Sequence, residues 1–310
     1  MALLLDVIKS LRPRQWVKNL TLFAALIFSG NLFKTGLFIE TTLGVLIFSL
    51  LASSVYIIND IVDAPSDRLH PFKKERPIAA GRIPVSLAIT LSILGVFFSI
   101  LLGWRLSNYF GLMLLAYFAL QITYTFFLKH IIIFDVIVIA TGFMARVYAG
   151  AILINAHLSI WFLLGIISAA LFLAVGKRRA EINILEANVA AKHRATLSQY
   201  TPELLDTYLA MTATAAFLSW ALFTFFEPQG TSFELALVLA KLPLTLSGTS
   251  KWLMATIPVV IYGIMRYLFI IYQGSRAEAP ERVLLTDTPL LTTVGLWGLM
   301  VITILYGISP

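Results

Sequence analysis

The residue types that could do chemistry in this chain gather in one polar segment near residue 60. Its acidic part runs from Asn59 and Asp60 to Asp67, and five bases follow it: Arg68, Lys73, Lys74, Arg76 and Arg82. Carboxylates at such spacing suit a hard cation such as Mg²⁺, and flanking Lys and Arg side chains suit phosphate groups. The segment therefore predicts a metal–diphosphate site.

The acidic part has helical spacing. Four polar side chains fall at i, i+3, i+4 and i+7 and would share one helix face: Tyr56, Asn59, Asp60 and Asp63. Asp60 and Asp63 stand one turn apart, close enough to hold one Mg²⁺ between them or through water. We expect them to be the central metal ligands, with Asn59 beside them at the catalytic position.

Asp67 is the third candidate metal ligand, and Pro65 complicates its position. Proline disfavours helical geometry at the preceding residue. We therefore expect the helix to break near Pro65. Asp67 would then reach the metal from a loop or not at all.

Several bases of the chain are candidates for phosphate binding, although many inner-loop bases of membrane proteins serve only to set topology. Arg76 and Arg82 are better placed than Lys74. The candidate substrate-binding residues over the whole chain are Lys18, Tyr56, Lys73, Arg76, Arg82, Tyr124, Lys129, Lys177 and Arg178.

A second basic cluster, Lys177-Arg178-Arg179, ends a later apolar stretch. Three bases there could be plain stop-transfer charges, or they could form an anion site that faces the acidic segment. The sequence favours neither reading.

The elements that must position these residues are membrane helices. Of the 310 residues, 59% are hydrophobic and 13% are charged, which is more apolar surface than a soluble protein could cover. Nine apolar windows are long enough to cross about 30 Å of hydrocarbon. They are 17–34, 40–58, 86–106, 109–128, 131–154, 158–176, 205–226, 255–273 and 289–308. Pro243, Gly248 and two lysines argue against a tenth crossing within 227–254.

The distribution of Lys and Arg predicts the orientation of these spans. With the N-terminus in the cytoplasm, inner segments hold 17 bases and outer loops hold 4. Segments 59–86 and 177–204 then become cytoplasmic active-site loops in a plasma-membrane protein. Chemistry on one side favours an enzyme over a transporter. Residues 1–310 form one predicted domain, with an interfacial helix over 1–16.

Other features limit the functional classes. The net charge of +7 follows from basic inner loops and requires no nucleic acid. The absence of cysteine excludes disulfide and thiolate chemistry. Arg146 lies inside a span, three helical turns after Asp135, so we expect it to be ion-paired or aimed at a polar cavity.

Together these residues resemble the UbiA superfamily of intramembrane prenyltransferases, whose members have nine helices around a laterally open cavity. The pattern Asn59-Asp60-x-x-Asp63-x-x-x-Asp67 matches the first Asp-rich motif of that superfamily. Typical members carry a second Asp-rich motif after the sixth span. Here that position reads Gly176-Lys177-Arg178-Arg179, so bases replace the acids.

This departure, with the run Arg12-Pro13-Arg14-Gln15-Trp16-Val17-Lys18-Asn19, resembles the phosphoribosyltransferase branch of the superfamily. The resemblance implies Mg²⁺-dependent transfer of 5-phosphoribose from phosphoribosyl diphosphate to a polyprenyl (decaprenyl) phosphate for cell-wall arabinan synthesis. It implies Mg²⁺ at Asp60 and Asp63 and the 5-phosphate at Lys177 and Arg178, with a homo-oligomer possible. The alternative is transfer of a prenyl group from a prenyl diphosphate to a small acceptor, and a non-enzymatic anion carrier is the third reading.

Overall fold

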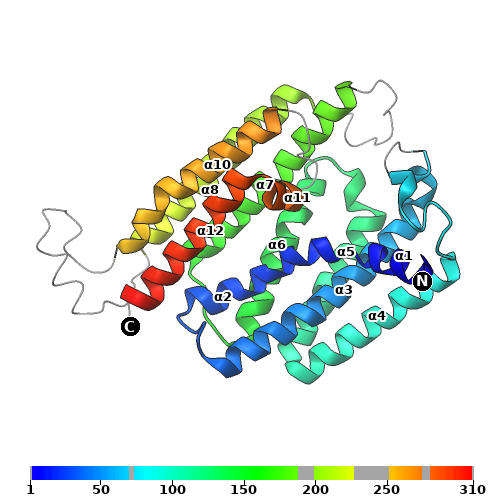
Figure 1. The fold of residues 1–310 in the computed structure, drawn as a ribbon, viewed down its shortest axis with the longest axis horizontal. Helices are drawn as coiled ribbons and strands as arrows, with labels where there is room; N and C mark the ends of the chain where they lie inside the picture. The colour runs from blue at the N-terminus through cyan, green and yellow to red at the C-terminus, as the bar shows by residue number, and fades with distance from the viewer. Residues whose placement is uncertain (1, 70–72, 188–198, 227–250, 274–279, 309–310) are drawn as a thin grey trace, which may run out of the picture. The chain divides into compact units, whose positions relative to one another are not determined.

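The structure, a computed structural model, describes residues 2–69, 73–187, 199–226, 251–273 and 280–308. In these ranges the regular elements are all helices (Figure 1). The chain forms two compact units. The first comprises residues 1–26, 31–156 and 185–200, and the second comprises residues 27–30, 157–184 and 201–310.

Eight helices in the described ranges are long and apolar enough to cross a membrane. They are Thr35–Asp67 (α3), Val85–Leu106 (α4), Asn108–Phe126 (α5), Phe134–Leu153 (α6), Ile160–Ile182 of α7, Pro202–Phe226 (α8), Trp252–Tyr272, which includes α10, and Thr288–Gly307, which includes α12. These eight coincide with the second to ninth predicted spans, so the all-α membrane architecture is confirmed.

The first predicted span, 17–34, has a different form. A 3₁₀ helix covers Pro13–Leu22, and the short α-helix α2 follows over Phe23–Phe28. The chain then turns at Gly30, whose φ of +72° suits glycine. This segment is shorter than a membrane-length α-helix, so the count of nine spans stays a prediction. Residues 227–250, where a tenth span was argued against, lie outside the described residues.

The N-terminal helix is also shorter than predicted. α1 covers Ala2–Leu11 rather than 1–16, because Arg12 adopts a left-handed conformation before Pro13. Four large apolar side chains of α1 are exposed: Leu3, Leu4, Leu5 and Ile8. Two other apolar side chains of α1, Val7 and Leu11, pack on a cluster formed by Ile57, Ala64, Ile78, Ile83 and Ala88. Exposed apolar side chains on a short terminal helix are typical of an interfacial helix.

In the first unit, α3 packs along α4, α4 along α5 and α5 along α6 (Figure 1). The core joins these helices through fully buried side chains such as Phe48, Phe110 and Leu114. The 3₁₀ helix packs on α6, where a Cβ on Gly150 would lie 2.0 Å from the Leu22 carbonyl oxygen. Glycine is therefore required for this close approach, which fixes the segment that follows Arg12.

The second unit contains α7 (Ile160–Ala187), α8, α10 (Ile257–Tyr272), α11 (Pro280–Thr286) and α12 (Thr288–Ile302). An aromatic cluster fills part of it: Phe28, Phe162, Trp220, Phe223 and Trp297. Asp287 caps α12 by accepting from the Leu290 amide at 2.9 Å and pairs with Arg266 at 2.7 Å. The hydrogen bond from Arg266 holds the pKa of the Asp287 carboxyl below its ordinary value.

Candidate active site

The acidic motif lies on a helix and not in a loop. α3 runs through Pro65 and ends at Asp67, so the predicted loop 59–86 is helical from Asn59 to Asp67. Pro65 stands two residues from the helix end, where its missing amide deprives only the Ile61 carbonyl of a partner. The predicted break is therefore wrong. Asp67 stays helical, and only 4% of its surface is exposed.

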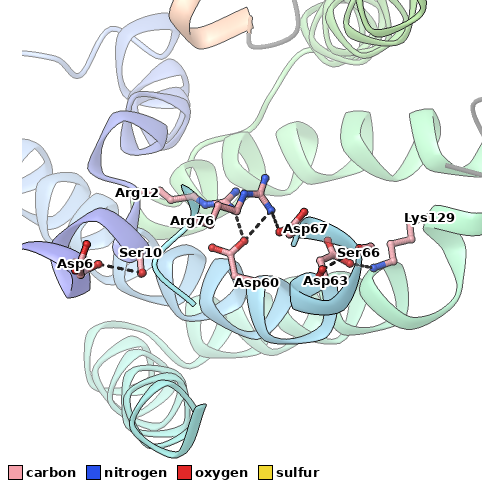
Figure 2. Close-up of polar contacts among 9 residues, drawn as sticks. All are labelled: Asp6, Ser10, Arg12, Asp60, Asp63, Ser66, Asp67, Arg76 and Lys129. Atoms are coloured by element: carbon pink, nitrogen blue, oxygen red, sulfur yellow. Dashed lines mark hydrogen bonds and ion pairs between the residues drawn. The ribbon is translucent and has the colours of Figure 1, made fainter. Parts of the chain in front are cut away.

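Asp60 and Asp67 converge on a single atom. Arg76 Nη1 donates to Asp60 Oδ1 at 3.0 Å and to Asp67 Oδ2 at 2.6 Å (Figure 2). The two acids stand seven residues apart, which places them on the same helix face. We predicted that Asp60 would share a cation with Asp63, whereas the structure brings it together with Asp67.

A tight turn carries Arg76 back to α3. The Ala80 amide donates to the Arg76 carbonyl at 2.8 Å, and the turn ends at Gly81, whose φ is +72°. Arg68, just after α3, donates through Nε to the Ala79 carbonyl at 3.1 Å. The turn is thus fixed to the end of the helix that it serves, which positions the Arg76 guanidinium.

Arg12 is a second cation on Asp60, and the analysis of individual residues missed it. Its Nη2 donates to Asp60 Oδ1, and its guanidinium lies 5.0 Å from the centre of the Tyr56 ring. Its φ of 52° and ψ of 59° are left-handed, which is costly for a residue before proline. The Arg12-Pro13 dipeptide indicates a turn in the chain. The local sequence does not show which carboxylate the Arg12 side chain would contact.

Hydrogen bonds on both sides of Arg12 hold this conformation. Ser53 Oγ on α3 donates to the Leu11 carbonyl at 2.8 Å, and Trp16 Nε1 donates to Ser53 Oγ at 2.9 Å. Because one serine bonds to the chain before and after Arg12, the surrounding structure holds the strained backbone in place.

Asp63 has its own partner. Lys129, in the 3₁₀ helix Leu128–His130 after α5, places Nζ 2.6 Å from Asp63 Oδ1 (Figure 2). Tyr124, another predicted substrate residue, lies half-buried near the end of α5. The structure therefore brings Lys129 to the acidic motif across 66 residues of sequence.

Three other predicted site residues belong to the first unit. Arg82 pairs with Asp6 of α1 through Nε and Oδ1 at 3.1 Å, and it also donates to the Glu75 carbonyl. It ties α1 to the turn and does not contact the acids of the motif. Lys73 opens the 3₁₀ helix Lys73–Glu75, and Lys18 is an electrostatic neighbour of the Tyr117 hydroxyl.

The basic cluster at 177–179 lies on α7 in the second unit, so the predicted loop 177–204 also begins as a helix. Arg178 is buried and pairs with Glu181 at 2.6 Å. Arg179 pairs with Asp206 of α8 at 2.6 Å. These ion pairs stay within the second unit.

Arg146 is buried among neutral partners. Its guanidinium donates to Asn19 Oδ1 at 2.9 Å, to the Gly142 carbonyl at 2.7 Å and to the Tyr117 hydroxyl at 2.8 Å. The expected pairing with Asp135 is wrong, because Asp135 accepts instead from the Tyr200 hydroxyl at 2.8 Å. Arg146 thus joins the 3₁₀ helix to α5 and α6.

The residues of the motif fit a Mg²⁺ ion. Asn59 Oδ1 is buried and has no hydrogen-bond partner among the described residues, and Asn59 precedes Asp60 on the helix that also carries Asp67. All three offer hard oxygen atoms. Within the described ranges no group of three or more acids or histidines forms a ready cage. Mg²⁺ does not need one, since it commonly uses one or two carboxylates with waters and substrate phosphates.

Comparison with known proteins decides the family. Residues 20–286 match the family model described as the UbiA prenyltransferase family. The chain belongs to this family. Membership agrees with the helical fold and with the placement of the acidic motif at the end of a long membrane helix.

Two relatives resemble this UbiA family member over most of its length. One, from Mycolicibacterium smegmatis, is 34% identical over 285 residues, which is 91% of this chain and 86% of the relative. Another, from Corynebacterium glutamicum, is 33% identical over 304 residues, which is 97% of this chain and 86% of the relative. Both are named decaprenyl-phosphate phosphoribosyltransferase.

Solved structures confirm the fold of the family. A UbiA homolog from Archaeoglobus fulgidus, described as bound to GPP and Mg²⁺, has a TM-score of 0.70 at 19% identity. The comparison covers 97% of this chain and 99% of that one. At this identity the likeness shows the architecture alone.

Proposed function

We propose that this protein transfers 5-phosphoribose from phosphoribosyl diphosphate to a polyprenyl phosphate, with release of diphosphate. The observation that carries the proposal is the similarity over more than nine-tenths of the chain to two relatives named decaprenyl-phosphate phosphoribosyltransferase. The cluster of acids and bases at the end of α3 supports it, because the reaction needs a site for a metal-bound diphosphate.

The acidic motif would hold the metal in this reaction. Asp60, Asp67 and Asn59 are the best-placed ligands, and Asp63 is a further candidate beside Lys129. When bound, Mg²⁺ would neutralise charge on the leaving diphosphate. Arg12, Arg76 and Lys129 lie against the same acids and would supply the remaining positive charge.

The bond changes need little proton chemistry. An oxygen of the acceptor phosphate forms a bond to C1 of the ribose, and the bond from C1 to the diphosphate oxygen breaks. The electron pair leaves with the diphosphate. Because the acceptor phosphate is already anionic, no strong general base is required. The protein contributes positioning and charge stabilisation.

A separate basic pocket would hold the 5-phosphate of the donor. Lys177 and Arg178 are our candidates, with Lys18, Lys73 and Tyr56 as further contacts to substrate. The pairing of Arg178 with Glu181 holds its guanidinium in one position. A guanidinium held in this way suits a phosphate group, because charge-assisted hydrogen bonds to phosphate are strong.

The setting of the reaction belongs to the same proposal. The chain would cross the plasma membrane nine times, with its N-terminus and active site facing the cytoplasm. The acceptor tail would lie in the bilayer, and decaprenyl phosphate is the acceptor in the names of the relatives. A role in supplying cell-wall arabinan precursors, and assembly into a homo-oligomer, complete the proposal.

A donor comparison tests the reaction class. Purified protein is incubated with Mg²⁺, decaprenyl phosphate and phosphoribosyl diphosphate, and separately with a prenyl diphosphate and an aromatic acceptor. Mass analysis of the lipid products identifies the group transferred. We expect a phosphoribosylated lipid in the first mixture and no new product in the second. Prenylation of the aromatic acceptor would support the alternative reaction.

A further inference from the structure

The cluster at the end of α3 is electrically balanced by its own residues. Three carboxylates and three bases pair with one another: Asp60, Asp63 and Asp67 with Arg12, Arg76 and Lys129. The formal charge of these six side chains sums to zero. Every carboxylate of the motif therefore already has a cation, and every one of these bases already has an anion.

We propose that this self-neutralised cluster makes the metal and the diphosphate bind cooperatively, each strengthening the binding of the other, with Arg12 as the residue that sets the coupling between them. This inference rests on the proposed function only in assuming that a diphosphate is a ligand. It concerns how the site selects a metal–diphosphate complex over either component alone.

The reason is the cost of leaving a buried charge without a partner. The side chains of Asp60 and Asp67 are 3% and 6% exposed, so water cannot replace a lost ion pair. If Asp60 and Asp67 bind a metal without diphosphate, Arg12 and Arg76 lose their anions. If these bases bind diphosphate alone, Asp60 and Asp67 lose their cations. When both ligands enter, the carboxylates bind the metal and the bases bind diphosphate, so every charge keeps a partner.

Arg12 is suited to exchanging Asp60 for diphosphate. Its backbone is fixed, and its side chain has a second contact besides Asp60. The bonds through Ser53 hold the chain on both sides of it. Its guanidinium lies over the Tyr56 ring, and this cation–π contact does not require Asp60. Its side chain is 23% exposed against 3% for Asp60, so the cation lies on the outer side of the pair.

The test uses the full chain in detergent, with Mg²⁺ alone, inorganic diphosphate alone, and both together. Calorimetry gives each affinity after correction for the complex that the two ligands form in solution. We expect saturating diphosphate to tighten Mg²⁺ binding by about 10- to 100-fold, and Mg²⁺ to tighten diphosphate binding by the same factor. Equal Mg²⁺ affinities with and without diphosphate would overturn the proposal.

Variants of Arg12 separate its charge from its backbone conformation. Arg12→Gln should tighten binding of Mg²⁺ alone by about tenfold, because one competing cation has gone, and should reduce the coupling. Arg12→Gly also relieves the strain of the left-handed backbone, and it should have the same effects on Mg²⁺ binding and on the coupling as Arg12→Gln. Arg14→Gln removes a charge from an exposed position in the same segment and serves as the control, with unchanged affinities.

Thermal unfolding of each variant verifies that it is folded before binding is measured. Weaker binding of Mg²⁺ alone by Arg12→Gln would contradict the proposal, because Arg12 would then support the metal and not compete with it. Both ligands lack ribose and lipid. Coupled binding in a protein that transfers no phosphoribose would therefore leave this inference standing while the proposed function fails.

Discussion

Asp60 and Asp67, two helical turns apart on α3, accept hydrogen bonds from the same nitrogen atom of Arg76. Their oxygens are therefore directed at one point. A cation of the right size at this point would meet oxygen ligands from both acids. This pair is the structural basis for placing the metal. It makes Asp67 as strong a candidate metal ligand as Asp60.

Asp67→Asn should therefore reduce activity as severely as Asp60→Asn. Each change removes a charged oxygen ligand from a site that stabilises the leaving group, so we expect kcat/KM to fall by about 100-fold or more. Initial rates of phosphoribosyl transfer at saturating Mg²⁺ measure the effect.

Glu40→Gln is the matched control for these variants. Glu40 is an exposed acid near the other end of the same helix, and its removal should leave the rate unchanged. Near-normal activity of Asp67→Asn would show that Asp67 is only a structural partner of Arg76.

Lys129→Met should weaken donor binding. Lys129 is the cation on Asp63, and a charged hydrogen bond to a phosphate contributes about 1.5–3 kcal/mol, so the donor KM should rise by about 10- to 150-fold. The acceptor KM should move far less. Steady-state kinetics with each substrate varied in turn gives the two constants, and an equal rise in both would place Lys129 outside the donor site.

The basic cluster on α7 offers a comparison of two adjacent arginines. If Arg178 binds the 5-phosphate, Arg178→Ala should raise the donor KM by about 10- to 150-fold. Arg179→Ala should instead lower thermal stability, because Asp206 loses its salt bridge and Tyr272 loses its cation–π contact. An unchanged donor KM in Arg178→Ala would remove this cluster from the active site.

Arg146→Met should destabilise the protein. The change leaves Asn19, the Gly142 carbonyl and Tyr117 without their buried donor, and such losses cost about 1–3 kcal/mol for each group. The midpoint of thermal unfolding in detergent should fall by several degrees. Arg105→Gln, at an exposed position on α4, should have no such effect. An unchanged midpoint in Arg146→Met would contradict the structural role of this side chain.

Local pattern was enough to predict the helices that carry the site. Apolar runs of membrane length correspond to eight long helices, and the helical spacing of Asn59, Asp60 and Asp63 holds in α3. Pro65 misled the prediction because the cost of proline depends on where the helix ends. Within the last turn it removes a single hydrogen bond, which the helix tolerates.

The pairing of charges could not be predicted in the same way. Arg12 meets Asp60 across 48 residues and Lys129 meets Asp63 across 66. Such contacts depend on helix packing and on the left-handed turn before Pro13. The spacing of residues along the sequence does not predict them. The neutral partners of Arg146 have the same origin, since Asn19 and Tyr117 come from distant segments.

A double-label transfer experiment tests the central claim most directly. Purified protein in lipid vesicles receives Mg²⁺, decaprenyl phosphate and phosphoribosyl diphosphate labelled in the ribose carbons and in the terminal phosphate. We predict that the ribose label enters the lipid fraction while the phosphate label appears as free diphosphate in equal amount, and that Asp60→Asn abolishes both. A lipid fraction without ribose label, in a preparation that binds Mg²⁺ and diphosphate, would contradict the proposed function.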